Sequence, residues 1–542
     1  MTALPPRGER LLPILTGVLL VTAFPPFPLL LPSFIALVPL LVFVAERPAG
    51  SAGRWSAGRG GFIAGLVYFG LLLYWMVVAL VFYSALAIPA YLLTTIVLAG
   101  LVAVFAWLVH FVREHARVPL VISAPVFWTA AEWVQGNLGD LSFPWLGLGT
   151  SLAAFPVLAG AADLVGARGL TFWLAAVNGL VADAVLRARS GRSALRSAVA
   201  AAVAAAVPAL YGWWRAETLE LRPAARVAVV QPNIPEDLKL DREQAVDSSL
   251  ASLRRLMAEL EPGSVNVVVW PEVTLPAALQ HPAEAGLVEA VREMSAQVRA
   301  PIIAGAYGLG GAPERPTIFN SAFMVTADGL VAYPYSKIHL VPFVERVPFI
   351  DPSRLEALVG ELRYFGALSP GDDTPVMVAG GTTFGILICY ESAFAGLARL
   401  YRRAGTEYLV NMTNDAWYGR EEWYGRTTAL WQHPAHLVMR AIEQRVGVAR
   451  AANTGISMFV DPRGRTYERT PLFEPAVRVA TVYTTDVVTL YARWGDWVGS
   501  GAALLAAVLA AAAWLAKREA AARARGARFW PWGGGRVPRV PS

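Results

Sequence analysis

The stretch 383–392, which reads TFGILICYES, decides the fold of the middle of this chain. Its first six residues are largely apolar, as is typical of a strand that is buried on both faces of a sheet. Cys389 and three polar residues end this run, and a helical pattern follows at 393–404. The stretch therefore predicts a strand, a turn that carries Cys389, and a helix.

Further strands and helices alternate on both sides of this stretch. Strand-like runs lie at 226–230, 265–270, 301–306, 321–325, 383–388, 408–411 and 446–451, and helical patterns at 242–260, 283–298, 393–404 and 427–444. Apolar strands that alternate with helices are typical of layered α/β folds with buried sheets. We therefore expect one α/β domain over residues 214–490.

The rest of the chain is too apolar for a soluble protein. The 542 residues are 56% hydrophobic and only 16% charged, with a mean hydropathy of +0.47. Because a helix needs about 20 apolar residues to cross a bilayer, we expect about eight transmembrane helices. Their predicted positions are 11–24, 28–45, 61–83, 87–112, 118–135, 160–186, 194–213 and 497–516.

The first two of these spans form a retained helical hairpin in our interpretation. Arg7 and Arg10 precede an apolar run, as they do in a signal peptide, but no convincing cleavage site with small residues follows. Instead the turn FPPFP at 24–28 leads straight into the second apolar run.

The positions of the arginines predict the topology. Loops 46–60, 113–117 and 187–197 contain Arg47, Arg54, Arg59, Arg113, Arg117, Arg187, Arg189, Arg192 and Arg196. The positive-inside rule places these loops and both termini in the cytoplasm, so that the α/β domain lies in the periplasm. The predicted parts are transmembrane helices in 1–213, the α/β domain in 214–490, a last transmembrane helix in 491–516 and a disordered basic tail in 517–542.

Charge and cysteine content exclude other classes. The net charge is +6, but the basic residues lie in short loops beside apolar runs, which argues against a nucleic-acid partner. The only cysteine cannot form an intrachain disulfide, and no glycine-rich phosphate loop is present.

Three residues of the α/β domain are candidates for chemistry. Cys389 is either a nucleophile at the start of a helix, whose N-terminus stabilises a thiolate, or a buried structural cysteine. Glu272 ends the run VVVWPE, where burial would raise the pKa of its carboxyl and suit it as a base; otherwise it is a surface residue. Lys337 is either an oxyanion stabiliser or a solvated lysine.

The motifs around these residues occur in a characteristic order. They are WPE at 270–272, SKIHLVPFVE at 336–345, ICYES at 388–392, TNDAWYG at 413–419 and RAANTGIS at 450–457. This set resembles the nitrilase superfamily, and in particular its membrane-bound branch, the apolipoprotein N-acyltransferases, over nearly the whole chain.

The resemblance implies an αββα sandwich and a Glu-Lys-Cys triad. It implies Glu272 as general base, Lys337 as oxyanion stabiliser and Cys389 as nucleophile, with Glu345, Tyr390 and Glu391 in support. Trp145 and Trp417 are candidate substrate contacts. No cofactor and no metal are expected.

The implied reaction is an acyl transfer in two steps. A phospholipid in the bilayer donates a fatty acyl chain to the cysteine, which forms a thioester. The acceptor is the α-amino group of the N-terminal diacylglyceryl-cysteine of an apolipoprotein. Two alternatives remain: a membrane-tethered amidase or nitrilase that uses water as acceptor, and a transporter or scaffold without catalysis.

Some residues depart from the family pattern or invite another interpretation. Leu240 and Gln135 stand where a tryptophan and an arginine are expected, and Glu132 is an ionisable residue in an apolar span. His433, His436, Arg440 and Glu443 share one helical stretch, which permits a metal site. Without a second cysteine or an HExxH pattern, we favour a structural helix.

Overall fold

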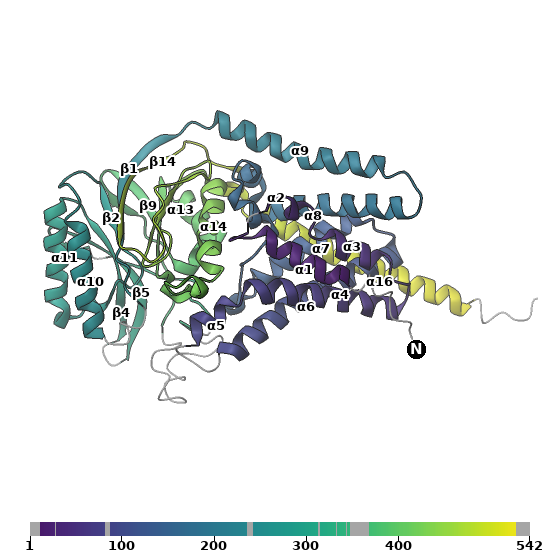
Figure 1. Cartoon of the computed structure of the whole chain (residues 1–542), viewed down its shortest axis with the longest axis horizontal. Coiled ribbons are helices and arrows are strands. Elements are labelled where there is room, and N and C mark those ends of the chain that lie inside the picture. Colours follow the sequence, from purple (N-terminus) through teal and green to yellow (C-terminus); the bar gives the residue numbers. More distant parts are fainter. Residues whose placement is uncertain are drawn as a thin grey trace, which may run out of the picture.

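The computed structural model describes residues 11–27, 29–81, 87–235, 242–312, 315–331, 333–342, 344–346 and 368–526. These residues form two parts that lie side by side, a bundle of helices and an α/β sandwich (Figure 1). The predicted departure at Leu240 and the end of the basic tail lie outside the described residues.

The helical part contains most of the chain before the sandwich and one helix after it. Its helices are α1 (Leu12–Ala23), α2 (Leu30–Ile35), α3 (Val38–Ala45), α4 (Ser51–Leu72), α5 (Trp75–Leu80), α6 (Ala87–Ala116), α7 (Leu120–Gln135), α8 (Ala162–Arg189), α9 (Leu195–Thr218) and α16 (Trp497–Gly526). Within the described residues, five helical segments are long and apolar enough to cross a membrane: Ser51–Ala79, Ala87–Ala116, Leu158–Arg189, Leu195–Thr218 and Trp497–Arg523. The predicted number of about eight crossings stays a prediction, since the other apolar helices are shorter.

The predicted bounds of one span are wrong. We expected a span at 61–83, but α4 begins at Ser51 and a separate short helix, α5, follows its end at Leu72. Arg54 can lie in the helix because its guanidinium pairs with Glu114 of α6 at 2.7 Å. Gly61 allows the close packing of α4 on α6, since a Cβ atom there would lie 2.4 Å from the backbone oxygen of Val102.

The sandwich contains two sheets. The first has the order β14 (Ala476–Thr484), β1 (Arg222–Gln231), β2 (Val267–Val269), β4 (Ile302–Ala312), β5 (Arg315–Thr326) and β6 (Gly329–Leu330), with β3 (Leu275–Ala278) beside β4 and β7 (Tyr335–Ser336) beside β5. The second has the order β13 (Thr466–Tyr467), β12 (Met458–Val460), β11 (Gly447–Ala452), β10 (Tyr408–Thr413), β9 (Thr382–Ile388) and β8 (Met377–Ala379). Each predicted strand overlaps one of these, whereas β3, β6, β7, β8, β12, β13 and β14 were not predicted.

Alternate residues of β1 show how the layers form. Val227 and Val229 belong to the core that the two sheets share, whereas Ala228 and Val230 belong to a second core beneath α10 (Arg242–Met257) and α11 (Ala285–Val298). Because side chains alternate between the two faces of a strand, both faces of this sheet are covered. With α13 (Ala395–Arg403) and α14 (Ala429–Gln444) on the second sheet, the result is the predicted αββα sandwich (Figure 1).

Helix α14 lies on the side of the sandwich that faces the helical part (Figure 1). Near its start, Thr428 Oγ1 donates to the backbone oxygen of Leu72 at 3.0 Å. Near its end, Glu443 accepts from the N–H of Ala167 at 2.9 Å. The helix therefore contacts both α4 and α8 while it covers the sheet that carries Cys389.

Candidate active site

Three ionisable side chains meet between the two sheets. Lys337 Nζ lies 3.0 Å from Glu272 Oε1 and 2.9 Å from Glu345 Oε1. The amide of Asn320 donates to both carboxylates, and the N–H of Asn414 donates to Glu272 Oε2 at 2.9 Å. Glu272, Lys337 and Glu345, which we call the lysine cluster, hold one positive charge between two negative ones, and Lys337 is only 1% exposed.

The ends of four strands bring the site residues together. Glu272 follows β2 and Lys337 follows β7 of the first sheet, whereas Cys389 follows β9 and Asn414 follows β10 of the second. Strands β9 and β10 are parallel neighbours, so their carboxyl ends lie at one edge. Backbone groups beyond a strand end are free to turn, which is why functional side chains gather there.

One electrostatic prediction for Glu272 is wrong. Burial alone would raise the pKa of its carboxyl, as we expected, but the Lys337 ammonium and the N–H donors of Asn320 and Asn414 outweigh burial and hold that pKa below its usual value. Burial would likewise lower the pKa of Lys337, but Glu272 and Glu345 raise it well above its usual value. Both shifts favour the ionised forms of Glu272 and Lys337 at rest.

Cys389 occupies a constrained turn directly after β9. Its φ angle is +50°, a conformation that residues other than glycine adopt only when their surroundings enforce it. Its Sγ lies 3.9 Å from the hydroxyl of Tyr418, and the residue is 6% exposed. Burial and the Glu272 carboxylate raise the pKa of the Cys389 thiol against the opposing effect of Lys337.

The prediction that a helix begins at Cys389 is wrong. The residues after β9 form a 3-10 turn of five residues, Cys389–Ala393, and α13 begins only at Ala395. The expected stabilisation of the thiolate is absent at rest, because burial and Glu272 raise the pKa of the Cys389 thiol. The proton stays on sulfur until a reaction removes it.

Glu391 ties the cysteine turn to the segment that follows Lys337. Its Oε2 accepts from the N–H of Ile388 at 2.7 Å, and its Oε1 accepts from Tyr335 and from the N–H groups of Ile338 and His339. Burial raises the pKa of Glu391 to about 7 although these donors oppose the rise. This carboxyl thus joins the ends of β7 and β9.

A second ionic group also contacts the cysteine turn. His433 Nδ1 lies 3.0 Å from Asp415 Oδ1, and Arg450 Nη2 donates to Asp415 Oδ2 at 2.5 Å. His433 Nε2 donates to the backbone oxygen of Cys389 at 2.9 Å. We call Asp415, His433 and Arg450 the histidine cluster, and none of its side chains is exposed to solvent.

The sequence prediction did not include the contact between His433 and Cys389. We assigned His433 to a structural helix, which α14 is, but its ring also reaches the turn of the candidate nucleophile. A usable signal was the polar pair Asn414-Asp415, because it lies shortly after the predicted strand at 408–411, and it directly follows the observed β10 beside β9. Within the described residues, no group of three or more His, Cys, Asp and Glu side chains is arranged to hold a metal ion.

Comparison with known proteins identifies the family. The family model of carbon-nitrogen hydrolases matches residues 226–490, and that of the N-terminal domain of apolipoprotein N-acyltransferase matches residues 16–180. A protein of Geobacter metallireducens named apolipoprotein N-acyltransferase is 33% identical, with 94% of this chain and 96% of its own covered. The chain belongs to the apolipoprotein N-acyltransferase family. A namesake from Chlorobaculum tepidum is 30% identical, with 94% and 97% covered.

The resemblance of the sequence motifs to apolipoprotein N-acyltransferases is thus confirmed over nearly the whole chain. Among solved structures, the nitrilase-superfamily member Nit3 of Saccharomyces cerevisiae matches 49% of this chain and 92% of its own, with 19% identity and a TM-score of 0.35. The family assignment rests on the relatives. Family membership and the apolar helices make the chain a bacterial membrane protein.

Gln135, where we expected an arginine, stabilises a loop at the junction of the two parts. Gln135 ends α7, and its amide donates to the backbone oxygens of Phe143 and Trp145 at 2.8 and 2.9 Å. The Trp145 ring is 1% exposed and lies over Tyr390, with 6.2 Å between ring centres. Gln135 therefore positions an aromatic ring next to the cysteine turn.

The structure also shows the surroundings of Tyr390 and Trp417, two further predicted site residues. The hydroxyl of Tyr390 donates to the backbone oxygen of Ser142 at 2.8 Å, so this side chain joins the sandwich to the helical part. Trp417 is partly buried and packs against the main core. Trp145 and Trp417 as substrate contacts, and Glu345, Tyr390 and Glu391 as supporting residues, stay predictions.

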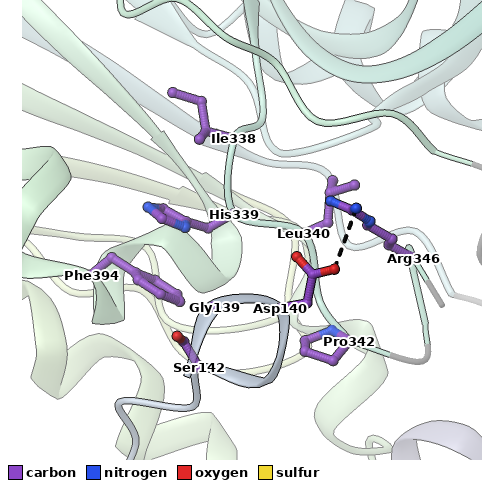
Figure 2. Close-up of a pocket in the computed structure, with 9 residues that line it drawn as sticks. All are labelled: Gly139, Asp140, Ser142, Ile338, His339, Leu340, Pro342, Arg346 and Phe394. Atoms are coloured by element: carbon purple, nitrogen blue, oxygen red, sulfur yellow. Dashed lines mark ion pairs between the residues drawn. The ribbon is translucent and has the colours of Figure 1, made fainter. Parts of the chain in front are cut away.

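Two adjoining cavities are lined by residues of both the sandwich and the helical part. Figure 2 shows the smaller one, of about 70 Å³, where Arg346 pairs with Asp140 at 3.3 Å. The larger one, of about 800 Å³, has Glu132 of α7 in its lining, and this carboxylate accepts from Trp128, Thr171 and the N–H of Leu148. Among the described residues that line these two cavities, Cys389 does not occur.

Proposed function

We propose that this chain transfers a fatty acyl chain from a membrane phospholipid, through a thioester on Cys389, to the α-amino group of the N-terminal diacylglyceryl-cysteine of apolipoproteins. The observation that carries this proposal is the lysine cluster beside the turn of Cys389, in a chain whose relatives are named apolipoprotein N-acyltransferase. The apolar helices supply the bilayer contact that a lipid donor requires.

In the first step, Cys389 attacks the ester carbonyl of the phospholipid. Glu272 accepts the thiol proton as the carbon–sulfur bond forms, so a raised thiol pKa at rest does not prevent the attack. Lys337 stabilises the negative charge on the carbonyl oxygen, and its own charge is maintained by Glu345. The ester carbon–oxygen bond then breaks, and the leaving alkoxide takes the proton from Glu272 to become a lysophospholipid alcohol.

In the second step, the amine of the acceptor attacks the thioester carbonyl. An α-amino group has a pKa near 8, so a usable fraction is neutral at neutral pH. The carbon–sulfur bond breaks as the amide forms, and Glu272 takes the proton from the attacking nitrogen and returns it to the thiolate of Cys389. The enzyme is thereby regenerated without a cofactor.

The proposed topology follows the arginine-rich loops. Both termini lie in the cytoplasm, and the sandwich lies on the periplasmic face. The diacylglyceryl-cysteine and the phospholipid are both anchored in the same leaflet, so they reach Cys389 from the membrane side.

The test is to incubate the purified full-length chain with phosphatidylethanolamine and follow its intact mass. The expected result is one added acyl chain on wild type and none on Cys389→Ser. A diacylglyceryl-cysteine peptide should remove the adduct and appear as the N-acyl product. Hydrolysis of the adduct at equal rate with and without the peptide would instead support a tethered amidase, and absence of any adduct on Cys389 would overturn the proposal.

A further inference from the structure

The turn that carries Cys389 is enclosed by a ring of hydrogen bonds. On one side of the turn, the amide of Asn411 donates to the backbone oxygen of Leu387 at 3.0 Å. On the other side, His433 Nε2 donates to the backbone oxygen of Cys389 itself at 2.9 Å. Two carbonyl groups that flank the constrained residue are thus held from outside β9.

Arg450 closes the ring between these two contacts. Its Nη1 donates to Asn411 Oδ1 and its Nη2 to Asp415 Oδ2, both at 2.5 Å. Asp415 Oδ1 faces His433 Nδ1 at 3.0 Å. The path from Leu387 through Asn411, Arg450, Asp415 and His433 therefore returns to Cys389 without a gap.

The ring is buried and its geometry defines the role of each member. The side chains of Asn411, Asp415, His433 and Arg450 are 0% exposed, so water does not compete for their hydrogen bonds. A backbone carbonyl only accepts, so His433 Nε2 must carry a proton. Asp415 fixes the orientation of the ring from the other nitrogen, as a carboxylate does for a histidine in many sites.

We propose that His433 is a positioning residue for Cys389, and that the ring formed by Asn411, Arg450, Asp415 and His433 sets the direction of the Cys389 sulfur. A φ of +50° is unfavourable in a residue other than glycine, so the turn keeps this conformation only while its carbonyls are held. Without the Nε2 donor, Cys389 relaxes and Sγ moves away from the lysine cluster. This inference rests on the proposed function, because it takes Cys389 as the nucleophile.

The experiment compares two residues of similar length at position 433. His433→Gln places an amide donor near the position of Nε2, whereas His433→Met has none. With the full-length chain and phosphatidylethanolamine in mixed micelles, we expect the rate constant of thioester formation to fall by about 10- to 100-fold in His433→Met. We expect His433→Gln to stay close to wild type, and the phospholipid concentration at half-maximal rate to change little in either.

The matched control is His436→Met. His436 lies further along the same helix, is also buried, and packs against Trp145 with 4.6 Å between ring centres. Its replacement should lower the melting temperature about as much as His433→Met but leave thioester formation near the wild-type rate. Equal rates for the two replacements at position 433, or equal losses for His433→Met and His436→Met, would overturn the inference.

A second variant keeps the test open if His433→Met does not fold. Asn411→Asp retains the contact with Arg450 but removes the donor to the Leu387 oxygen, so thioester formation should slow here as well. An unchanged rate of thioester formation would contradict the proposed role of the ring in positioning Cys389. Failure of the proposed function is distinguishable, because wild type itself would then form no thioester.

Discussion

The lysine cluster and the histidine cluster both lie beside the Cys389 turn, but their charges are balanced differently. Lys337 has two carboxylate partners, Glu272 and Glu345. Arg450 has one, Asp415, and its other contacts are to Asn411, to the backbone oxygen of Ile456 and to His433 Nδ1. In the lysine cluster a carboxylate can therefore take up a proton while the lysine stays paired, whereas the histidine cluster tolerates no such change.

The largest effect is expected in the lysine cluster. Glu272→Gln should slow thioester formation by about 10²- to 10⁴-fold, because the base that accepts the thiol proton is lost. The melting temperature should change little, since Lys337 keeps Glu345. Single-turnover mass spectrometry and a thermal melt check both points. Glu345→Gln removes the same charge but leaves the base, so a loss as large as that of Glu272→Gln would contradict the assignment of Glu272.

Asp415→Asn tests the opposite behaviour in the histidine cluster. It leaves Arg450 buried without a carboxylate, so the free energy of unfolding should fall by about 3–5 kcal/mol. Thermal unfolding in detergent micelles measures this loss. A melting temperature equal to that of wild type would contradict the dependence of Arg450 on its single carboxylate partner. The conservative variant Asp415→Glu, which keeps the charge, serves as the control.

Tyr418→Phe probes the space between the clusters. The Tyr418 hydroxyl lies 3.9 Å from Cys389 Sγ, and burial raises the pKa of Tyr418 well above its usual value, so it remains a donor. Loss of this weak contact should slow iodoacetamide labelling of Cys389 by about three- to tenfold. The ring keeps its packing against Trp75, so stability should hold. Faster labelling than in wild type would indicate that the hydroxyl only shields the sulfur.

The smallest effect concerns a histidine outside both clusters. Burial lowers the pKa of His339 to about 4, and its ring stacks on Phe394 (Figure 2). Between pH 6.5 and 4 the unfolded state binds the proton and the folded state does not, so this contribution to stability is lost as pH falls through that window. In His339→Phe, the melting temperature should therefore drop by a few degrees less between pH 7 and pH 5 than in wild type. An equal drop would contradict the lowered pKa.

The strand ends were predictable from the sequence, but the ion pairs were not. The apolar runs before Glu272 and Cys389 mark buried strands, and polar residues directly after such runs identify the edge where chemistry gathers. The pKa of Glu272 was mispredicted because its direction depends on Lys337 and Asn414, which are distant in the sequence. For the same reason, periodicity identified α14 as a helix but did not reveal that His433 reaches Cys389.

Boundaries failed where tertiary contacts override composition. The basic residue Arg54 argued against a helix at its position, yet Glu114 neutralises it inside the bundle. Strand β14 was not predicted, although it pairs with β1 along nearly its full length and so covers what would otherwise be an open edge of the first sheet.

The junction at the end of α14 has a consequence for the order of biosynthesis. Arg445 donates to Asp163 of α8 at 2.9 Å, but Asp163 also accepts from Tyr211 and Arg215 of α9. Both partners on α9 are translated long before Arg445. The ribosome can therefore deliver α8 and α9 with this acidic group already paired, and Arg445 of the sandwich then joins a cluster that formed before it.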